Sequence, residues 1–291
     1  MVRIPRARRL RHAVRLRLLQ AMQDAVVPVV AAQVDELRRE QQRRFTELSA
    51  QVEGLRVGMH AREVRDRRDM LAAGEREAVE SSARFVRDAM TGARTFPTPP
   101  ETLAHALSLA PTGGMALEFG VYSGTTLRQI AAARNGAEVY GFDSFEGLPE
   151  DWRAGFRAGT FAVEQVPEVE GAELVVGWFS ETLPAFFEAH PGPVDVLHLD
   201  ADLYSSTATA LELVGPRLRP GSVVVFDEYL NHSGWQDGEH RAWREFVAAH
   251  DIEFVYEAFT HDSEQVVVVI TGTRDVGAPE PRHASDTAGH T

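Results

Sequence analysis

The sequence predicts an α/β fold in which a parallel sheet is covered by helices on both faces and is preceded by a helical arm. After about residue 100, apolar strand-like runs alternate with helical stretches, the pattern of a doubly wound sheet. Before about residue 90, strand-like alternation is missing and turn chemistry is almost absent. A proline-rich connection, Thr95–Pro100, separates the two patterns and places a domain boundary near residue 95.

The arm is expected to be helical from Leu10 to about Met90, with an interruption near Pro28. Five apolar residues follow one another in steps of three and four, which is the pattern of a short coiled-coil seam: Phe45, Leu48, Val52, Leu55 and Met59. Val34 and Leu37 fit the same seam after a stutter. The arm therefore packs either on its own domain or on a second copy, and we expect a homo-oligomer.

The first 30 residues carry seven arginines against a single acid, Asp24. Because these arginines alternate with leucine and valine, this segment could instead lie on an anionic membrane surface as a peripheral contact. The chain as a whole has a formal net charge of −13, which argues against a nucleic-acid-binding protein.

The second domain is expected over residues 96–274 and contains seven strands. They are predicted at residues 115–121, 138–142, 173–178, 194–199, 222–226, 253–259 and 265–271. Helices are predicted at residues 125–133, 181–190, 205–217 and 239–250. The last two strands follow each other closely and should form an antiparallel hairpin on the sheet edge. Residues 275–291 have no periodicity and are expected to form a disordered tail.

The composition limits the possible metal ligands and catalytic groups, and it indicates where the protein is located. The chain has no cysteine, which excludes disulfides, thiolate metal sites and cysteine catalysis, and leaves oxygen and imidazole ligands for any metal. No apolar run is long enough for a membrane-spanning helix, and no secretory signal is recognisable at the start. A cytoplasmic location is the resulting expectation.

A glycine turn after the first strand is the first candidate site. Gly120 and Gly124 let the backbone pass close to a ligand, although the same spacing also occurs in strand-to-helix turns that bind nothing. Asp143 ends the next strand, 23 residues beyond Gly120, where an acid can accept hydrogen bonds from ribose hydroxyls. Glu118 is unsuited to a pyrophosphate but suits the amino and sulfonium groups of S-adenosylmethionine.

Three acids at the ends of two neighbouring strands form the second candidate site. Asp200 ends the fourth strand and Asp227 the fifth, with Glu228 next to it. Their mutual repulsion favours a hard divalent cation, Mg²⁺ before Ca²⁺ or Mn²⁺. Asp202 is either a further ligand or a residue that caps the following helix.

Four ordered motifs resemble the macrocin O-methyltransferase family. They are Leu117-Glu-Phe-Gly-Val-Tyr-Ser-Gly124, Gly141-Phe-Asp-Ser-Phe-Glu-Gly-Leu-Pro-Glu-Asp-Trp152, Gly177-Trp-Phe-Ser-Glu-Thr-Leu-Pro184 and Leu199-Asp-Ala-Asp-Leu-Tyr-Ser-Ser-Thr207. The resemblance covers residues 112–271 and implies a Rossmann-like, seven-stranded class I methyltransferase domain. It also implies S-adenosylmethionine as the cofactor, commonly with Mg²⁺, and the hydroxyl of a sugar, a glycan or a glycosylated small molecule as the acceptor.

The resemblance implies a role for individual residues of this chain. Around the methionine part of the cofactor it places Glu118, Gly120, Ser123 and Gly124. At the ribose it places Asp143, with Ser144 and Phe145 beside it. Trp178 and Phe179 would approach the adenine, although two aromatics at a strand end are as typical of core packing. The metal positions are Asp200, Asp227 and Glu228, the last replacing the family's second aspartate.

Two residues are candidates for the base that takes the hydroxyl proton. Asp200 can serve as ligand and base together, and His232 lies in the loop after Glu228, where a histidine is more often a solvated surface residue. His198 is set aside because it lies within the strand that leads to Asp200. The rival functions are a phenol or catechol O-methyltransferase, for which a narrow aromatic slot would be expected, and a non-catalytic scaffold that binds a nucleoside.

Overall fold

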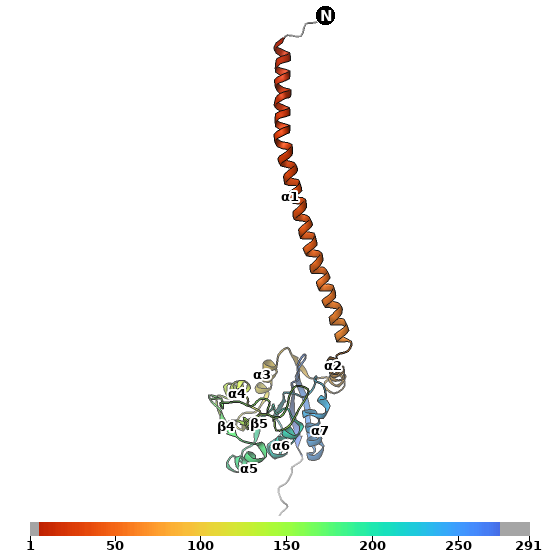
Figure 1. The fold of residues 1–291 in the computed structure, drawn as a ribbon. Helices are drawn as coiled ribbons and strands as arrows, with labels where there is room; N and C mark the ends of the chain where they lie inside the picture. Colours follow the sequence, from red (N-terminus) through yellow and green to blue (C-terminus); the bar gives the residue numbers. More distant parts are fainter. Residues whose placement is uncertain (1–5, 274–291) are drawn as a thin grey trace, which may run out of the picture. The chain divides into compact units, whose positions relative to one another are not determined.

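The computed structural model describes residues 6–273, and the chain divides into two units between Asp69 and Met70 (Figure 1). The helices are α1 (Arg6–Asp66), α2 (Met70–Ala89), α3 (Pro99–Leu109), α4 (Thr125–Ala133), α5 (Phe179–Ala189), α6 (Tyr204–Val214) and α7 (Glu239–His250), with short 3-10 helices η1 (Gly215–Arg217) and η2 (Trp235–Asp237). The strands are β1 (Arg94–Phe96), β2 (Met115–Phe119), β3 (Val139–Asp143), β4 (Glu173–Val176), β5 (Val194–Leu199), β6 (Val223–Phe226), β7 (Ile252–Thr260) and β8 (Val266–Thr273).

The second unit is built on one eight-stranded sheet with the order β1-β7-β8-β6-β5-β2-β3-β4. Strands β2 to β6 pair in parallel, and β8 runs antiparallel to both β6 and β7. The chain winds outward from β2 through β3 and β4, then returns to the other side of β2 at β5. This reversal between β2 and β5 confirms the predicted Rossmann-like fold, and it marks the place where such sheets bind ligands, outside the carboxyl ends of the strands.

Helices cover both faces of the sheet because its strands are apolar on both sides. On β2, Met115, Leu117 and Phe119 belong to one core and Ala116 to the other, as the two-residue period of a strand requires. The first core includes residues of α2, α5, α6 and α7, and the second includes residues of α3 and α4. These two layers fix the carboxyl edge of the sheet, on which the candidate site is built.

The sheet has one strand more than the seven that the sequence predicts. The additional strand, β1, is three residues long and pairs in parallel with β7, so β1 and not the β7–β8 hairpin forms this edge of the sheet. It lies where the sequence predicts a proline-rich connection, and α3 begins directly after it at Pro99. Three residues are too few to show an alternating pattern, and proline at the first turn of a helix is compatible with helix formation.

The division between the units lies at residues 69 and 70, and not near residue 95, because α2 packs on the sheet domain. Ala78 and Ser82 are buried in this helix. The ring of Phe85 contacts the rings of Tyr229 and Trp235 at centroid distances of 6.3 and 5.3 Å. Helix α2 therefore belongs to the core of the second unit.

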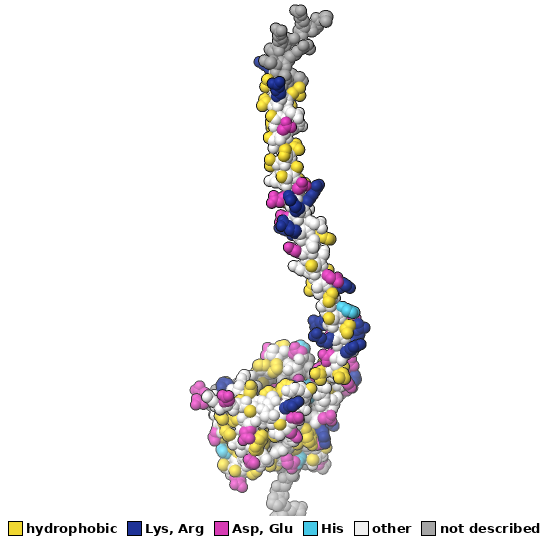
Figure 2. All heavy atoms as spheres, viewed as in Figure 1, with side chains coloured by type: hydrophobic (Ala, Val, Ile, Leu, Met, Phe, Trp, Pro, Cys, Tyr) yellow, Lys and Arg dark blue, Asp and Glu magenta, His cyan; other side chains and the backbone are white. Residues whose placement is uncertain are grey.

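Helix α1 runs without a break through Pro28, so the predicted interruption there is wrong. None of its described side chains is buried within the unit it forms, and hydrophobic side chains lie along its surface (Figure 2). The predicted seam from Phe45 to Met59 is exposed throughout. Of the helices within residues 6–273, none combines the length and apolar character needed to cross a membrane. Residues 275–291, predicted to be disordered, lie outside the described part of the chain.

Candidate active site

The turn after β2 needs glycine because the ends of two strands meet there. Gly120 has φ 92°, and a Cβ atom at this position would lie 1.7 Å from the carbonyl oxygen of Asp200. Gly124 precedes α4 with φ 75°. The glycine that sequence reasoning assigns to a ligand therefore also has a structural purpose, since it lets the turn after β2 approach the turn after β5.

Asp143 organises this turn through backbone hydrogen bonds. Its Oδ2 accepts the N–H groups of Val121 and Tyr122, each at 2.9 Å, and its Oδ1 accepts the N–H of Phe145 at 2.7 Å. Asp143 thus joins the ends of β2 and β3 at the reversal of strand order. Its carboxylate also lines the cavity described next, where it is available to a ribose.

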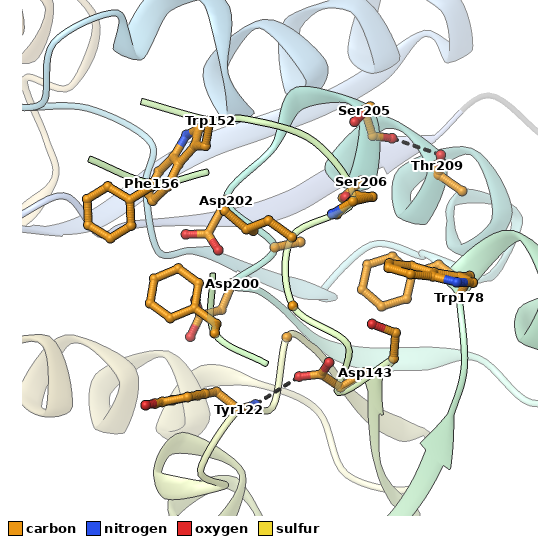
Figure 3. Close-up of a pocket in the computed structure, with 18 of the residues that line it drawn as sticks. Tyr122, Asp143, Trp152, Phe156, Trp178, Asp200, Asp202, Ser205, Ser206 and Thr209 are labelled. Atoms are coloured by element: carbon orange, nitrogen blue, oxygen red, sulfur yellow. Dashed lines mark hydrogen bonds between the residues drawn. The ribbon is translucent and has the colours of Figure 1, made fainter. Parts of the chain in front are cut away.

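A cavity of about 690 Å³ opens at the carboxyl ends of the strands (Figure 3). Its lining includes five of the residues predicted to hold the cofactor, and these are Gly120, Asp143, Ser144, Trp178 and Phe179. The size is within the range of small-molecule sites. We call the part lined by Asp143, Ser144, Trp178 and Phe179 the cofactor end.

Four other predicted cofactor residues are not part of the cavity lining. Glu118 and Phe145 are buried in the protein. The Ser123 hydroxyl lies 3.0 Å from that of Thr125, at the start of α4. At Gly124 a Cβ atom would meet the side chain of Val169 at 2.7 Å, so this glycine serves the packing of the turn.

Three carboxylates meet in the middle of the cavity lining. Asp200, Asp202 and Glu228 each offer an oxygen within 4.8 Å of the others, and we call them the acid group. Oε2 of Glu228 is buried without a hydrogen-bond partner in the described structure. Asp202 is held at φ 58°, and no side-chain hydrogen bond caps α6 within the described residues, which leaves the capping role of Asp202 without support.

The electrostatics of the acid group favour retained protons or a bound cation. Burial, followed by the charge of Asp227, raises the pKa of Asp200 and of Glu228 well above the ordinary range. For Asp202, burial is opposed by Arg153, and its pKa is about 7. Carboxylates in this state bind a divalent cation by releasing protons, and all their donor atoms are the oxygens that Mg²⁺ prefers.

Asp227, predicted as a metal ligand, faces other partners. Its Oδ1 accepts a hydrogen bond from Gln265 Nε2 at 3.1 Å, and it lies 3.9 Å from Nε2 of His198. Nδ1 of His198 lies 2.9 Å from Oε1 of Glu118. Although burial lowers the pKa of His198, Asp227 and Glu118 outweigh this effect and raise it. Glu118 therefore faces the buried ring of His198, and not the cavity.

His232, the second candidate base, is 4% exposed and does not line the cavity. Its Nε2 lies 3.1 Å from the carbonyl oxygen of Glu228, and its Nδ1 lies 3.2 Å from that of Ser233. These contacts hold the loop after β6. The histidine is neither a solvated surface residue nor in contact with the cavity.

Sequence reasoning missed Glu239, which supports the acid group from α7. Its Oε2 accepts the backbone N–H of Glu228 at 2.9 Å, and burial raises its pKa. The side chain thereby fixes the turn that carries Glu228. In the sequence it is one acid in the first turn of a predicted helix, a common position that gives no sign of this contact.

Comparisons with known proteins find similarity to methyltransferases in the part of the chain that forms this site. Residues 117–229 match the family model described as a methyltransferase domain. The chain is 35% identical over 141 residues to 8-demethyl-8-(2,3-dimethoxy-alpha-L-rhamnosyl)-tetracenomycin-C 4'-O-methyltransferase of Streptomyces olivaceus. It is 32% identical over 146 residues to demethyldecarbamoylnovobiocin O-methyltransferase of Streptomyces niveus. Each match covers 40% of this chain and 53% of the relative, so the chain spans about half the length of these relatives.

Among solved structures, the calicheamicin methyltransferase CalS11 aligns with a TM-score of 0.47 and 24% identity over 58% of this chain and 76% of that one. The O-methyltransferase NovP aligns with a TM-score of 0.46 and 25% identity over 60% of this chain and 79% of that one. Residues 117–229 thus match a methyltransferase domain, and the sheet that carries them has a Rossmann-like strand order. The predicted methyltransferase domain agrees with this match.

Proposed function

We propose that the protein transfers the methyl group of S-adenosylmethionine to a hydroxyl of a sugar, a glycan or a glycosylated small molecule, assisted by a divalent cation, Mg²⁺ first. The observation that carries this proposal is the position of the acid group beside the cofactor end in one cavity. The named activities of the two curated relatives, both O-methyltransferases, support the same reaction class.

The residues of the chain have distinct tasks in this reaction. At the cofactor end, Asp143 accepts hydrogen bonds from the ribose hydroxyls, and Trp178 and Phe179 contact the adenine. S-adenosylmethionine would supply the methyl group, and its transfer to the acceptor hydroxyl would form an O–CH₃ bond, break the S–CH₃ bond and release S-adenosylhomocysteine. In the absence of a cation, Asp202, with a pKa of about 7, is suited to accept the hydroxyl proton near neutral pH.

The acid group fits a divalent cation. Asp200, Asp202 and Glu228 would hold it, since their oxygens converge and Oε2 of Glu228 is buried without a partner in the described structure. A bound Mg²⁺ would lower the pKa of an acceptor hydroxyl and fix its position. Asp227, which the sequence suggests as a ligand, would then not hold the cation itself. It would contact His198, which lies next to the acid group.

The direct test is transfer of a labelled methyl group from S-adenosylmethionine to fractionated glycans and metabolites by the full-length protein. We expect transfer that stops on chelation and returns with Mg²⁺. Binding of NAD in place of S-adenosylmethionine would contradict the methyltransferase proposal. A full rate after chelation would contradict only the cation, leaving Asp202 or Asp200 as a simple base.

The second candidate is methylation of a phenol or catechol. Aromatic side chains do line the cavity, which favours a flat group within it. The position of the label in the product, on a sugar carbon or on an aromatic ring, separates the two reactions. A non-catalytic scaffold is less consistent with three converging acids, because binding a nucleoside does not require them.

We also propose that α1 mediates self-association, with contact to an anionic membrane as the alternative. The exposed apolar seam from Phe45 to Met59 supports this, and the second unit keeps α2 within its own core. A chain that begins at Met70 should bind S-adenosylhomocysteine like the full-length chain and have a smaller mass in light scattering. An unchanged mass would contradict self-association, and sedimentation with anionic vesicles tests the alternative.

A further inference from the structure

The cavity continues beyond the acid group into a cluster of aromatic side chains. We call the cluster the aromatic end, and it consists of Tyr122, Trp152, Phe156 and Phe161. Their rings touch in series at centroid distances of 5.7 Å (Tyr122–Phe161), 5.7 Å (Phe161–Phe156) and 5.2 Å (Phe156–Trp152). Three of them come from the long loop between β3 and β4, and Tyr122 comes from the turn after β2.

The aromatic end and the cofactor end meet at the acid group. In Figure 3, Phe156 lies on the side of Asp202 away from Trp178, while Trp152 lies above Asp202 and Tyr122 below Asp200. The backbone N–H of Tyr122 donates to Asp143, so Tyr122 lies where the two ends meet. A molecule whose hydroxyl reaches the acid group can therefore extend from there onto aromatic rings.

Two residues of the aromatic end have an unfavourable backbone conformation. Tyr122 and Phe161 lie in the left-handed region at φ 46° and 69°, which bulky side chains rarely adopt. Their side chains are nevertheless 51% and 37% exposed, so burial in the protein returns little of this cost. Strained residues of this kind gather at ligand sites, and here the exposed ring surface faces the cavity.

The charged residues that line the cavity determine what kind of acceptor molecule can bind there. Within the described lining there are four acids, namely Asp143, Asp200, Asp202 and Glu228, and a single cation, Arg153. Arg153 is already paired with Glu264 at 3.1 Å and lies 4.0 Å above the ring of Trp152. A diphosphate group would meet one engaged arginine among these acids, because phosphate recognition requires free cations or a cluster of N–H donors.

We infer that the aromatic end binds the flat, apolar aglycone of a neutral glycoside, so the acceptor is a sugar already attached to an aromatic or similarly planar group. A nucleotide-activated sugar is the acceptor class that the lining disfavours. This inference rests on the proposed function, since it concerns the same cavity. It assigns specificity to Tyr122, Phe156 and Phe161, through stacking against the rings.

The test compares three probes that carry the same sugar on the full-length protein saturated with S-adenosylhomocysteine. The probes are 4-nitrophenyl α-L-rhamnoside, methyl α-L-rhamnoside and thymidine-diphosphate-L-rhamnose, with binding measured by calorimetry. We expect the aryl rhamnoside to bind about tenfold or more tightly than the methyl rhamnoside, as one stacked ring pair with burial allows. The nucleotide sugar should bind no more tightly than the methyl rhamnoside.

A variant pair assigns the effect to the aromatic end. Phe161→Gly removes the ring while glycine accepts φ 69° without strain, so the fold of the loop is kept. It should lose most of the preference for the aryl rhamnoside and leave S-adenosylhomocysteine binding unchanged. Val166→Ala, in the same loop at an exposed position outside the cavity lining, is the matched control and should leave both unchanged.

The outcomes separate this inference from the function on which it rests. Failure to bind S-adenosylhomocysteine would contradict the proposed methyltransferase itself. Cofactor binding with equal affinity for aryl and methyl rhamnosides, or with no measurable binding of the aryl probe, would overturn only the aromatic subsite. Tightest binding of the nucleotide sugar would overturn it as well and identify an activated sugar as the acceptor. A full aryl preference in Phe161→Gly would place the aglycone elsewhere.

Discussion

An aspartate lies near each end of strand β5, and the two carboxylates are surrounded by opposite kinds of groups. Asp195, at its start, is fully buried, pairs with Arg219 at 2.6 Å and Arg134 at 3.3 Å, and accepts the N–H of Gly114 at 2.6 Å. Asp200, just after its end, has Asp202 and Glu228 as neighbours. A buried carboxylate paired directly with arginines holds the fold together, whereas carboxylates gathered next to one another can accept protons or a metal ion.

Asp143, at the tip of β3, is an intermediate case. It has no arginine in hydrogen-bond contact among the described residues, and three backbone N–H groups satisfy its carboxylate instead. Such hydrogen bonds stabilise the charge while leaving the side chain open to the cavity. The same residue type therefore has three different surroundings at three positions, and the proposed function assigns structure to Asp195, cofactor binding to Asp143 and chemistry to Asp200.

The largest expected effect is on catalysis, at Asp200. Asp200→Asn keeps the size of the side chain but removes the anion, and should lower the transfer rate by about 10³-fold, with S-adenosylhomocysteine binding unchanged. Asp195→Asn is the matched control, since it removes an anion from the other end of the same strand. Its rate per folded molecule should stay near that of the parent. Equal losses of rate in both variants would contradict the assignment of catalysis to Asp200 and of structure to Asp195.

The next effect concerns stability and runs in the opposite direction. Asp195→Asn leaves Arg134, whose side chain is 7% exposed, without its carboxylate. The free energy of unfolding should fall by about 3 kcal/mol, measured by urea denaturation. Asp200→Asn should leave it unchanged or raise it, because this substitution relieves repulsion between acids. A larger loss for Asp200→Asn would mean that Asp200 stabilises the fold.

Asp143→Ala tests the intermediate case. Loss of the ribose acceptor should weaken binding of S-adenosylhomocysteine by about 1 to 3 kcal/mol in calorimetry. The variant also loses three hydrogen bonds that order the turn, so the melting temperature should fall as well. Asp143→Asn keeps one acceptor oxygen and should lie between the parent and the alanine variant. Unchanged affinity in both variants would exclude Asp143 from the cofactor site.

The smallest effect is the pH dependence of stabilisation by Mg²⁺. Asp202 has a pKa of about 7 in the folded, metal-free protein, well above the 3.8 of a free aspartate side chain, so the metal-free fold loses stability as pH rises through this interval. Mg²⁺ must displace the retained proton below pH 7, and each displaced proton costs about tenfold in affinity per pH unit. The rise in melting temperature on adding Mg²⁺ should therefore be larger at pH 8 than at pH 5.5. An equal rise at both pH values, or in Asp200→Asn, would argue against cation binding at the acid group.

The sequence alone determined the seven main strands of the sheet domain and the helices between them, although not β1 or α3, and it located the positions where the chain leaves the strands. It predicted residues 125–133, 194–199 and 239–250 with the bounds of α4, β5 and α7. Apolar periodicity and turn residues act over a few positions, which makes such elements readable without the fold. For the same reason the sequence identified Gly120 and Asp143, because each follows directly from a strand end.

The tertiary structure alone decided which side chains meet. Asp202 and not Asp227 joins Asp200 and Glu228, because the left-handed backbone at Asp202 sets its direction, while Asp227 lies near His198. Helix α2 belongs to the sheet domain because its apolar side finds Tyr229 and Trp235, residues about 150 positions away in the chain. Contacts of this kind depend on strand register and layer packing, which no local pattern encodes. The aromatic end arises in the same way, from a turn after β2 and a loop after β3 that only the folded sheet brings together.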